Sequence, residues 1–333
     1  DPVCRKGIMS RFVAALFITL AFAGGILAQG TDSLQHYLIS GARAFNANDY
    51  DASRAAYQNA LRLHPDNVEA IRNLGLIANT LGDLQGAMSF FKRALSLDST
   101  DAGVYNNIGV IMNARGHTDS AISNFEKAVR CDRTNTQIHV NLAGEYVTVG
   151  RFTEAAEHLR GAIVVDTLRP EPPYLMGRAM LGMRQPDSAI YFFNMSLARG
   201  GTSASPDYYK GVAEMNVGRV ENAARSFSAA LAKDGKHRDA CHSLGIVRVM
   251  QGRHDEALKL FEHTVELDST FMNGWVSLGA ICMVTGKAAQ ADSIFHKLSA
   301  VDSTLGFRMI DLYNSEKIKA QKQTEQEKKP VRK

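Results

Sequence analysis

Apolar and small side chains recur along this chain with a period of 34 residues. A frame that starts at Leu34 runs without insertion or deletion to Leu305 and divides the stretch into eight units. In most units apolar or small residues stand at positions 4, 7, 8 and 11, and again at 20, 24, 27 and 28, which is the spacing of a helix face. Each unit therefore predicts two consecutive α-helices, the first over positions 2–14.

Two columns of the frame carry most of the packing information. Position 8 is glycine in all units but one: Gly41, Gly75, Gly109, Ala143, Gly177, Gly211, Gly245 and Gly279. Position 24 is an aromatic residue in all units but one: Tyr57, Phe91, Phe125, Leu159, Phe193, Phe227, Phe261 and Phe295. A missing side chain at position 8 lets two helices approach closely, and the ring at position 24 fills the neighbouring space. Because one helix pair cannot bury its apolar face alone, successive copies must stack.

Glycines and polar residues mark the predicted helix ends. Glycine at position 15 predicts a left-handed cap after the first helix; the residues are Gly82, Gly116, Gly150, Gly218, Gly252 and Gly286. In the fifth unit Arg184 replaces this glycine. Aspartate at position 31 marks the turn after the second helix, and the Ser-Thr pair that often follows is expected to cap the next helix. The stretch Arg199–Pro206 has the weakest packing pattern, and we expect a hinge there.

These columns resemble the tetratricopeptide repeat family, whose period is also 34 residues. The resemblance covers residues 34–305 as eight repeats, and the proline usual at position 32 occurs only as Pro65. It implies an all-α fold, a right-handed superhelical solenoid of helix hairpins. A capping helix over 306–318 is expected to dock on the eighth unit through Phe307, Ile310 and Tyr313. The resemblance also implies a concave groove, lined by the first helices, that binds partner peptides or helices.

The groove positions of the resembled family are 2, 5, 6, 9, 12 and 13 of the first helix. In the first half of this chain they hold asparagine repeatedly, and an amide that donates and accepts can pair with a peptide unit of an extended ligand. In the second half they are aromatic and apolar. The candidate partner-binding residues are Arg72, Asn73, Asn79, Asn106, Asn107, Asn113, Asn141, Tyr174, Arg178, Tyr208, Met215 and His242. The alternatives are that the asparagines satisfy local backbone and that half of the apolar residues are core.

The segment before the frame, residues 1–28, predicts a secretory signal peptide. Basic residues, the last of them Arg11, precede the apolar run Phe12–Ala28, which is short for a membrane span. Met9 is an alternative true start. The expected location is periplasmic or secreted; the alternative is an uncleaved segment that anchors the chain in the inner membrane.

The net charge of +4 comes from the two ends of the chain. The leading segment holds three basic residues and one acidic residue, and 316–333 holds seven and three, which leaves 28 basic and 30 acidic side chains between them. A body that is slightly acidic removes the case for nucleic-acid binding. Residues 319–333 predict a charged, disordered tail that makes at most weak contact with a membrane surface or envelope polymer.

Sequence motifs for catalysis, a metal or a cofactor are missing. The frame leaves no room for a catalytic domain, and there is no phosphate loop, HExxH or nucleophile elbow. Position 5 offers only Arg72 as a base, so the family's basic clamp for acidic chaperone tails is not expected. Cys131, Cys241 and Cys282 predict small buried apolar side chains rather than disulfides.

The sequence therefore predicts a non-enzymatic protein–protein interaction scaffold in the cell envelope. Two alternatives stay open from the sequence. One is a subunit of an envelope assembly or secretion complex. The other is an accessory protein whose asparagine and tyrosine side chains bind envelope polysaccharide.

Overall fold

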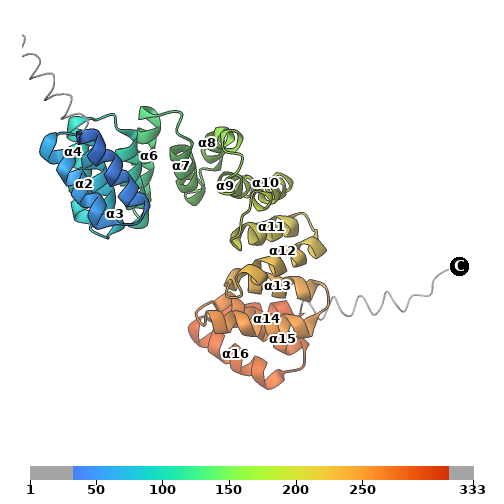
Figure 1. The fold of residues 1–333 in the computed structure, drawn as a ribbon. Helices are drawn as coiled ribbons and strands as arrows, with labels where there is room; N and C mark the ends of the chain where they lie inside the picture. The colour runs from blue at the N-terminus through green and yellow to red at the C-terminus, as the bar shows by residue number, and fades with distance from the viewer. Residues whose placement is uncertain (1–32, 315–333) are drawn as a thin grey trace, which may run out of the picture. The chain divides into compact units, whose positions relative to one another are not determined.

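The computed structural model of the chain describes residues 33–314, which form two compact units. Unit 1 ends at Glu145 and unit 2 begins at Tyr146, so the division falls within helix α7 (Figure 1). The predicted all-α fold is confirmed, because the described residues are helices joined by short turns, without a strand. The predictions for 1–28, for Met9 as a start, for 315–318 at the end of the capping helix and for 319–333 lie outside the described residues.

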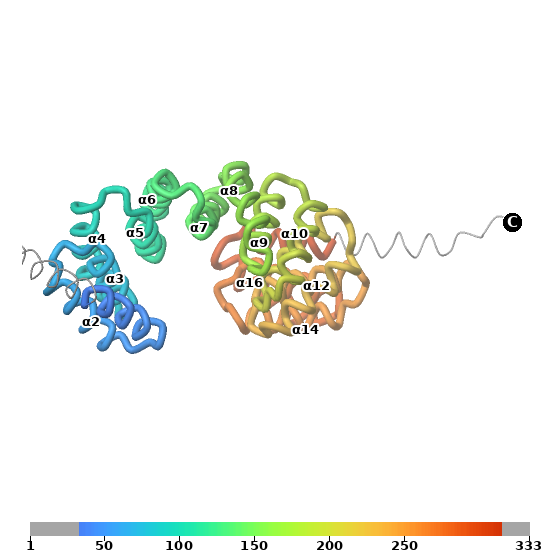
Figure 2. Tube along the Cα trace, turned by 45° about the horizontal axis from the view of Figure 1, so that its top comes forward, coloured from blue at the N-terminus to red at the C-terminus, as the bar shows by residue number. Residues whose placement is uncertain are grey.

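Unit 1 is a stack of helices that pack on their neighbours in the chain (Figure 2). It begins with a helix over residues 33–46. The helices that follow are α2 (Tyr50–Leu63), α3 (Val68–Thr80), α4 (Leu84–Leu97), α5 (Ala102–Ala114), α6 (Thr118–Cys131) and α7 (Thr136–Thr148).

Unit 2 continues the same alternation of helices. They are α8 (Phe152–Val165), α9 (Glu171–Gly182), α10 (Pro186–Ala198), α11 (Ser205–Asn216), α12 (Val220–Lys233), α13 (Arg238–Met250), α14 (His254–Leu267), α15 (Met272–Val284) and α16 (Ala288–Val301). A terminal helix over 303–314 follows. The first helix of each pair begins close to position 1 of the frame, so the helix pairs follow the 34-residue period. None of the helices within 33–314 is both long and apolar enough to span a bilayer.

The glycine and ring columns meet inside each helix pair. A Cβ built on Gly75 would lie 2.6 Å from Cε1 of Phe91, and one on Gly211 would lie 2.7 Å from Cε1 of Phe227. Both rings are buried. The predicted close approach is confirmed, and its cause is specific: the ring at position 24 occupies the volume that a side chain at position 8 would need.

The left-handed caps are confirmed as well. All six glycines at position 15 have φ between 70° and 83°. Asn48 (φ 59°) and Arg184 (φ 58°) stand at the same position of their units and adopt the same conformation. Asparagine tolerates this region, whereas arginine is strained in it.

The turn after the second helix is built differently from our expectation. The backbone N–H and the hydroxyl of Thr100 both donate to Asp98 Oδ1, at 2.8 and 2.7 Å. The same turn recurs at Asp132, Asp268 and Asp302. The threonine therefore closes the turn and does not cap the next helix. The cap comes from position 34, where Asn67 accepts from the N–H of Ala70 and Asp101 accepts from that of Val104.

The terminal helix docks through a residue that we did not predict. Met309 is buried and fills the space beside Gly279 that a ring fills in other pairs. Phe307, which we expected to dock, is 64% exposed, while Ile310 and Tyr313 are half-buried. The prediction for Phe307 was wrong because the helix lies outside the repeat frame, so that frame does not fix its buried face.

Two smaller expectations also need correction. Cys131 is exposed rather than buried, whereas Cys241 and Cys282 are buried as predicted. The stretch Arg199–Pro206, where we expected a hinge, is hydrogen-bonded to the end of α8. The guanidinium of Arg199 donates to the carbonyls of Ile163 (3.1 Å) and Asp166 (2.9 Å).

Candidate partner-binding surfaces

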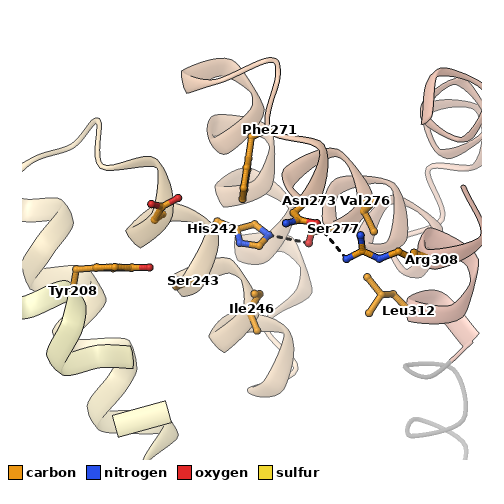
Figure 3. A pocket seen from close by; sticks show the side chains of 11 residues that line it. Tyr208, His242, Ser243, Ile246, Phe271, Asn273, Val276, Ser277, Arg308 and Leu312 are labelled. Carbon is orange, nitrogen blue, oxygen red and sulfur yellow. Dashed lines mark hydrogen bonds between the residues drawn. The ribbon is translucent and has the colours of Figure 1, made fainter. Parts of the chain in front are cut away.

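Unit 2 contains a pocket of about 420 Å³ that is lined by residues of α11, α13, α15 and the terminal helix (Figure 3). We call it the unit 2 pocket. Its lining residues are Tyr208 from α11; Asp239, His242, Ser243 and Ile246 from α13; Phe271, Asn273, Val276 and Ser277 at or in α15; and Arg308 and Leu312 from the terminal helix. The α13 residues stand at positions 2, 5, 6 and 9 of the frame, so these positions of successive first helices face one cavity.

His242 lines the unit 2 pocket, and its ring contacts residues of α15 and of the turn before it. Its Nε2 lies 3.0 Å from the hydroxyl of Ser277, and its ring meets that of Phe271 edge-on at 5.1 Å. Burial lowers the pKa of His242 below 6.5, and Asp239 opposes this shift only in part. The imidazole is therefore neutral at pH 7 and serves as a polar, uncharged part of the wall.

Tyr208 forms the opposite side of the unit 2 pocket. Its ring lies 4.8 Å from the ring of His237. Burial raises the pKa of the Tyr208 phenol, and the nearby Asp239 carboxylate raises it further. The hydroxyl therefore stays protonated at pH 7.

Charges around the unit 2 pocket are unevenly paired. Asp239 lies 2.7 Å from Arg238, which also donates to Asp268 at 2.7 Å. Arg308 donates from Nη2 to Asn273 Oδ1 at 3.2 Å, and within residues 33–314 it has no carboxylate at ion-pair distance. The acidic side chain of the lining is ion-paired with Arg238, which it shares with Asp268, whereas the basic side chain of the lining has no such ion pair within residues 33–314.

A second cluster on the first helices of unit 2 contains two predicted residues. The guanidinium of Arg178 lies over the ring of Tyr209, at 5.1 Å from its centre, and Tyr174 packs against Tyr209 at 6.1 Å. Burial raises the pKa of the Tyr174 phenol. Met215, also predicted as a partner-binding residue, is half-buried and packs against the core around Phe227.

The polar face of unit 1 consists of the predicted residues Arg72, Asn73, Asn79, Asn106, Asn107, Asn113 and Asn141 on α3, α5 and α7. Two of them form a short chain of amides. Asn141 donates to Asn106 across neighbouring first helices at 2.8 Å and accepts from Gln137 at 2.7 Å. These amides bond to each other, which supports the structural alternative for this pair.

Other amides of this face keep their hydrogen-bonding groups available. Asn73 and Asn107 stand at position 6 of α3 and α5, half-buried, and their side chains make no hydrogen bond to any residue in the described part of unit 1. Asn79 is half-buried and Asn113 is exposed. Arg72 differs, because it donates to the buried Asp101 at 3.0 Å and its charge is satisfied within the unit.

Sequence reasoning found part of the unit 2 pocket. It singled out Tyr208 and His242, and the family groove positions also cover Ile246 and Val276. It did not find Arg308 and Leu312, because the terminal helix has no place in the frame. No sequence signal connects Arg308 with Asn273, which lies 35 residues earlier. Whether partners bind at the predicted residues stays a prediction.

Comparison with known proteins agrees with the geometry. The sequence matches the tetratricopeptide repeat family over residues 41–102, in unit 1, and 208–270, in unit 2. No curated protein matches the chain. Three solved structures illustrate the similarity of the fold.

The APC/C hetero-tetramer Cut9–Hcn1 has a TM-score of 0.59 at 13% identity, covering 74% of this chain and 48% of that one. PilF of Pseudomonas aeruginosa has a TM-score of 0.57 at 16% identity, covering 63% and 96%. PilW, a type IV pilus biogenesis factor, has a TM-score of 0.55 at 18% identity, covering 60% and 92%. At these identities the likeness concerns the fold. The chain carries tetratricopeptide repeats, and its described part is an all-α solenoid of that kind.

Proposed function

We propose that this chain is a non-enzymatic protein-interaction scaffold of the cell envelope that binds segments of partner proteins on the first-helix faces of its units. The observation that carries the proposal is the unit 2 pocket, which is lined by positions 2, 5, 6 and 9 of successive first helices. Solenoid proteins use such repeated faces as extended binding surfaces.

The polar face of unit 1 supports an extended peptide as its ligand. The amides of Asn73 and Asn107 stand one repeat apart and have both donors and acceptors unused within unit 1. An extended peptide presents N–H and C=O groups that such amides can pair with. Two pairings of this kind contribute about 1–3 kcal/mol, or roughly tenfold in affinity.

The envelope location rests on the sequence. The basic residues before Phe12–Ala28, and the length of that apolar run, are typical of a secretory signal. PilF and PilW have similar folds, but at 16% and 18% identity this similarity concerns the fold alone and identifies no partner.

The test is a binding measurement with matched variants of the full chain. Peptides that bind are selected from a random decapeptide library, and affinity is measured by fluorescence anisotropy. We expect Asn73→Ala with Asn107→Ala to weaken peptide binding about tenfold. The control, Asn124→Ala on the second helix α6, removes an amide that bonds only within its own helix, to the Ser120 carbonyl. It is expected to change nothing.

Stability separates a binding role from a structural one. The double variant is expected to unfold within about 0.5 kcal/mol of wild type, because neither amide bonds inside the unit. Equal affinity of wild type and double variant would remove unit 1 from the proposal. Absence of any binding peptide, together with retention on a polysaccharide resin, would favour the polymer-binding alternative.

A further inference from the structure

We propose that the unit 2 pocket binds an apolar peptide segment that carries a carboxylate, and that Arg308 of the terminal helix binds this carboxylate. The inference rests on the proposed function and specifies the chemistry of the partner. It assigns a ligand-binding role to the terminal helix, which lies outside the repeats.

The charge pattern of the unit 2 pocket selects an acidic partner. Asp239 is ion-paired with Arg238, which also pairs with Asp268, and His242 is uncharged because burial lowers its pKa. Arg308 is the one cation among the lining residues and has no carboxylate partner within 33–314. A guanidinium has five N–H donors, and one of them is used by Asn273. The others can hold a carboxylate through two parallel hydrogen bonds.

The remaining walls select an apolar side chain next to that carboxylate. Ile246 and Leu312 are 40% and 44% exposed, and the buried Val276 of α15 also lines the pocket. Figure 3 shows Leu312 and the guanidinium of Arg308 on the same side of the cavity. A free small acid would leave the two exposed side chains in water, whereas a peptide segment covers them and gains the apolar burial.

Arg178, on the first helix α9 of unit 2, is a second cation without an ion-pair partner in the described residues. It stands at position 9 of its repeat, the position that Ile246 has in its own, and no carboxylate among residues 33–314 lies at ion-pair distance from it. Its guanidinium rests on the ring of Tyr209. Arg178 and Arg308 are therefore two cations of unit 2 without a carboxylate partner in the described residues, which favours partners with acidic residues and predicts that binding weakens with salt.

The experiment compares two peptides that differ in one functional group. The probes are fluorescein-labelled Ala-Leu-Val-Asp-Leu-Ile-Ala with blocked ends and the same peptide with Asn in place of Asp, and the protein is the full chain. We expect the Asp peptide to bind about tenfold more tightly than the Asn peptide at low salt, as a charge-assisted bidentate contact allows. Arg308→Gln should abolish this preference, and Arg308→Lys, which keeps the charge, should retain part of it.

The matched control is Arg225→Gln on the second helix α12. Arg225, like Arg308, donates to a neighbouring asparagine and has no carboxylate partner in the described residues, but it does not line the pocket. Its loss should leave the preference unchanged. Emission of Trp275 and circular dichroism verify the fold of each variant.

Three outcomes would overturn the inference, and each of them contradicts a different claim. If both peptides bind wild type equally, peptide binding stands and the carboxylate specificity is wrong. If the preference survives in Arg308→Gln, the carboxylate binds elsewhere. If neither these probes nor any library peptide binds, the proposed function fails together with the inference.

Discussion

At the scale of single residues, the fold depends on a pair of side chains repeated along the chain. The ring at position 24 lies where a Cβ of position 8 would be, as at Gly211 and Phe227. The sequence contains its own variation on this pair: the one unit with alanine at position 8, Ala143, has Leu159 instead of a ring at position 24. The two columns therefore vary together.

This pairing predicts the cost of one methyl group. Gly211→Ala would place Cβ 2.7 Å from the Phe227 ring, which is buried and cannot withdraw without disturbing its neighbours. We expect a loss of about 1–3 kcal/mol, the usual cost of overpacking. Urea unfolding followed by the emission of Trp275, the single tryptophan of the chain, measures it.

The double variant Gly211→Ala with Phe227→Leu provides the control. Leucine is smaller than phenylalanine, so the alanine methyl gains room and the two losses should be clearly less than additive. Strictly additive losses would show that the methyl group and the ring do not compete for the same space.

The residue scale also shows how far the sequence alone can predict this structure. The recurring residues at positions 8, 24 and 15 of the frame predicted the glycine–ring pairs and the left-handed glycines, because the eight repeats share the same local constraint. They did not predict Met309 at Gly279 or the exposure of Phe307, because the terminal helix occurs once and follows no frame. The exposed Cys131 was missed because a position in the last turn of a helix does not by itself fix burial.

At the scale of elements, several of the turns after second helices are closed by hydrogen bonds to a charged aspartate. The hydroxyl and N–H of Thr270 donate to Asp268, and Arg238 donates to it as well; these bonds lower the pKa of Asp268 from 3.8 to about 2. Because the folded-state pKa is the lower one, the stabilisation is complete above the unfolded pKa and is lost as pH falls through the folded value.

Acid unfolding tests this turn. We expect the free energy of unfolding to fall as pH decreases from about 4 to about 2. Thr270→Ala keeps the carboxylate and Arg238 but removes the hydroxyl, which is the largest cause of the shift. This variant should start from a lower stability and lose less of it over the same interval. An identical pH profile for both proteins would contradict the role of the hydroxyl.

His242, which lies on α13 against α15, also has a lowered pKa but for a different reason: burial disfavours its charged form, and the effect on stability has the same sign as for Asp268. Burial lowers its pKa below 6.5, so the folded chain resists a proton that the unfolded chain accepts. Stability is therefore complete above pH 6.5 and decreases as pH falls below it. Most carboxylates titrate below pH 5, and Glu145, whose pKa is raised by burial, is the same in both proteins. The variant His242→Gln should therefore show a flatter profile between pH 7 and pH 5 than wild type. Trp275 emission under urea provides the measurement, and equal slopes would exclude His242 as the cause.

The candidate site was predictable only as far as it follows the repeats. Positions 2, 5, 6 and 9 of α13 line the unit 2 pocket, as the family resemblance implied. Side chains inside such a face can bond to each other, as Asn141 and Asn106 do, or remain available, as Asn73 and Asn107 do. That distinction depends on which side chains of neighbouring helices meet in three dimensions, and a frame of positions does not contain this information.

At the scale of the whole molecule, the chain has two compact units although its frame is continuous. The sequence suggested a weak point at Arg199–Pro206, whereas the division falls between Glu145 and Tyr146. The boundary lies in the frame unit that has Ala143 and Leu159 in place of the glycine and the ring. Loss of the repeated glycine–ring pair was therefore a better sign of a boundary than a glycine-rich turn, because the pair reports on packing and the turn does not.

Because the chain has two compact units, we predict that a destabilising substitution in one unit leaves the urea midpoint of the other unit unchanged. A Cβ at Gly75 would lie 2.6 Å from the Phe91 ring, so Gly75→Ala overpacks unit 1 as Gly211→Ala overpacks unit 2. Trp275 belongs to unit 2 and reports on it alone, while circular dichroism reports on both units.

The two variants should therefore separate the two signals. Gly75→Ala is expected to lower the urea midpoint of part of the dichroism change and to leave the midpoint of Trp275 emission unmoved; Gly211→Ala should move the emission midpoint. Repeat proteins unfold with stabilities set by each repeat and its nearest neighbours, so a distant change reaches Trp275 only if the repeats in between unfold with it. An equal shift of the emission midpoint in both variants would mean that the continuous frame, and not the compact unit, sets the size of the cooperative block.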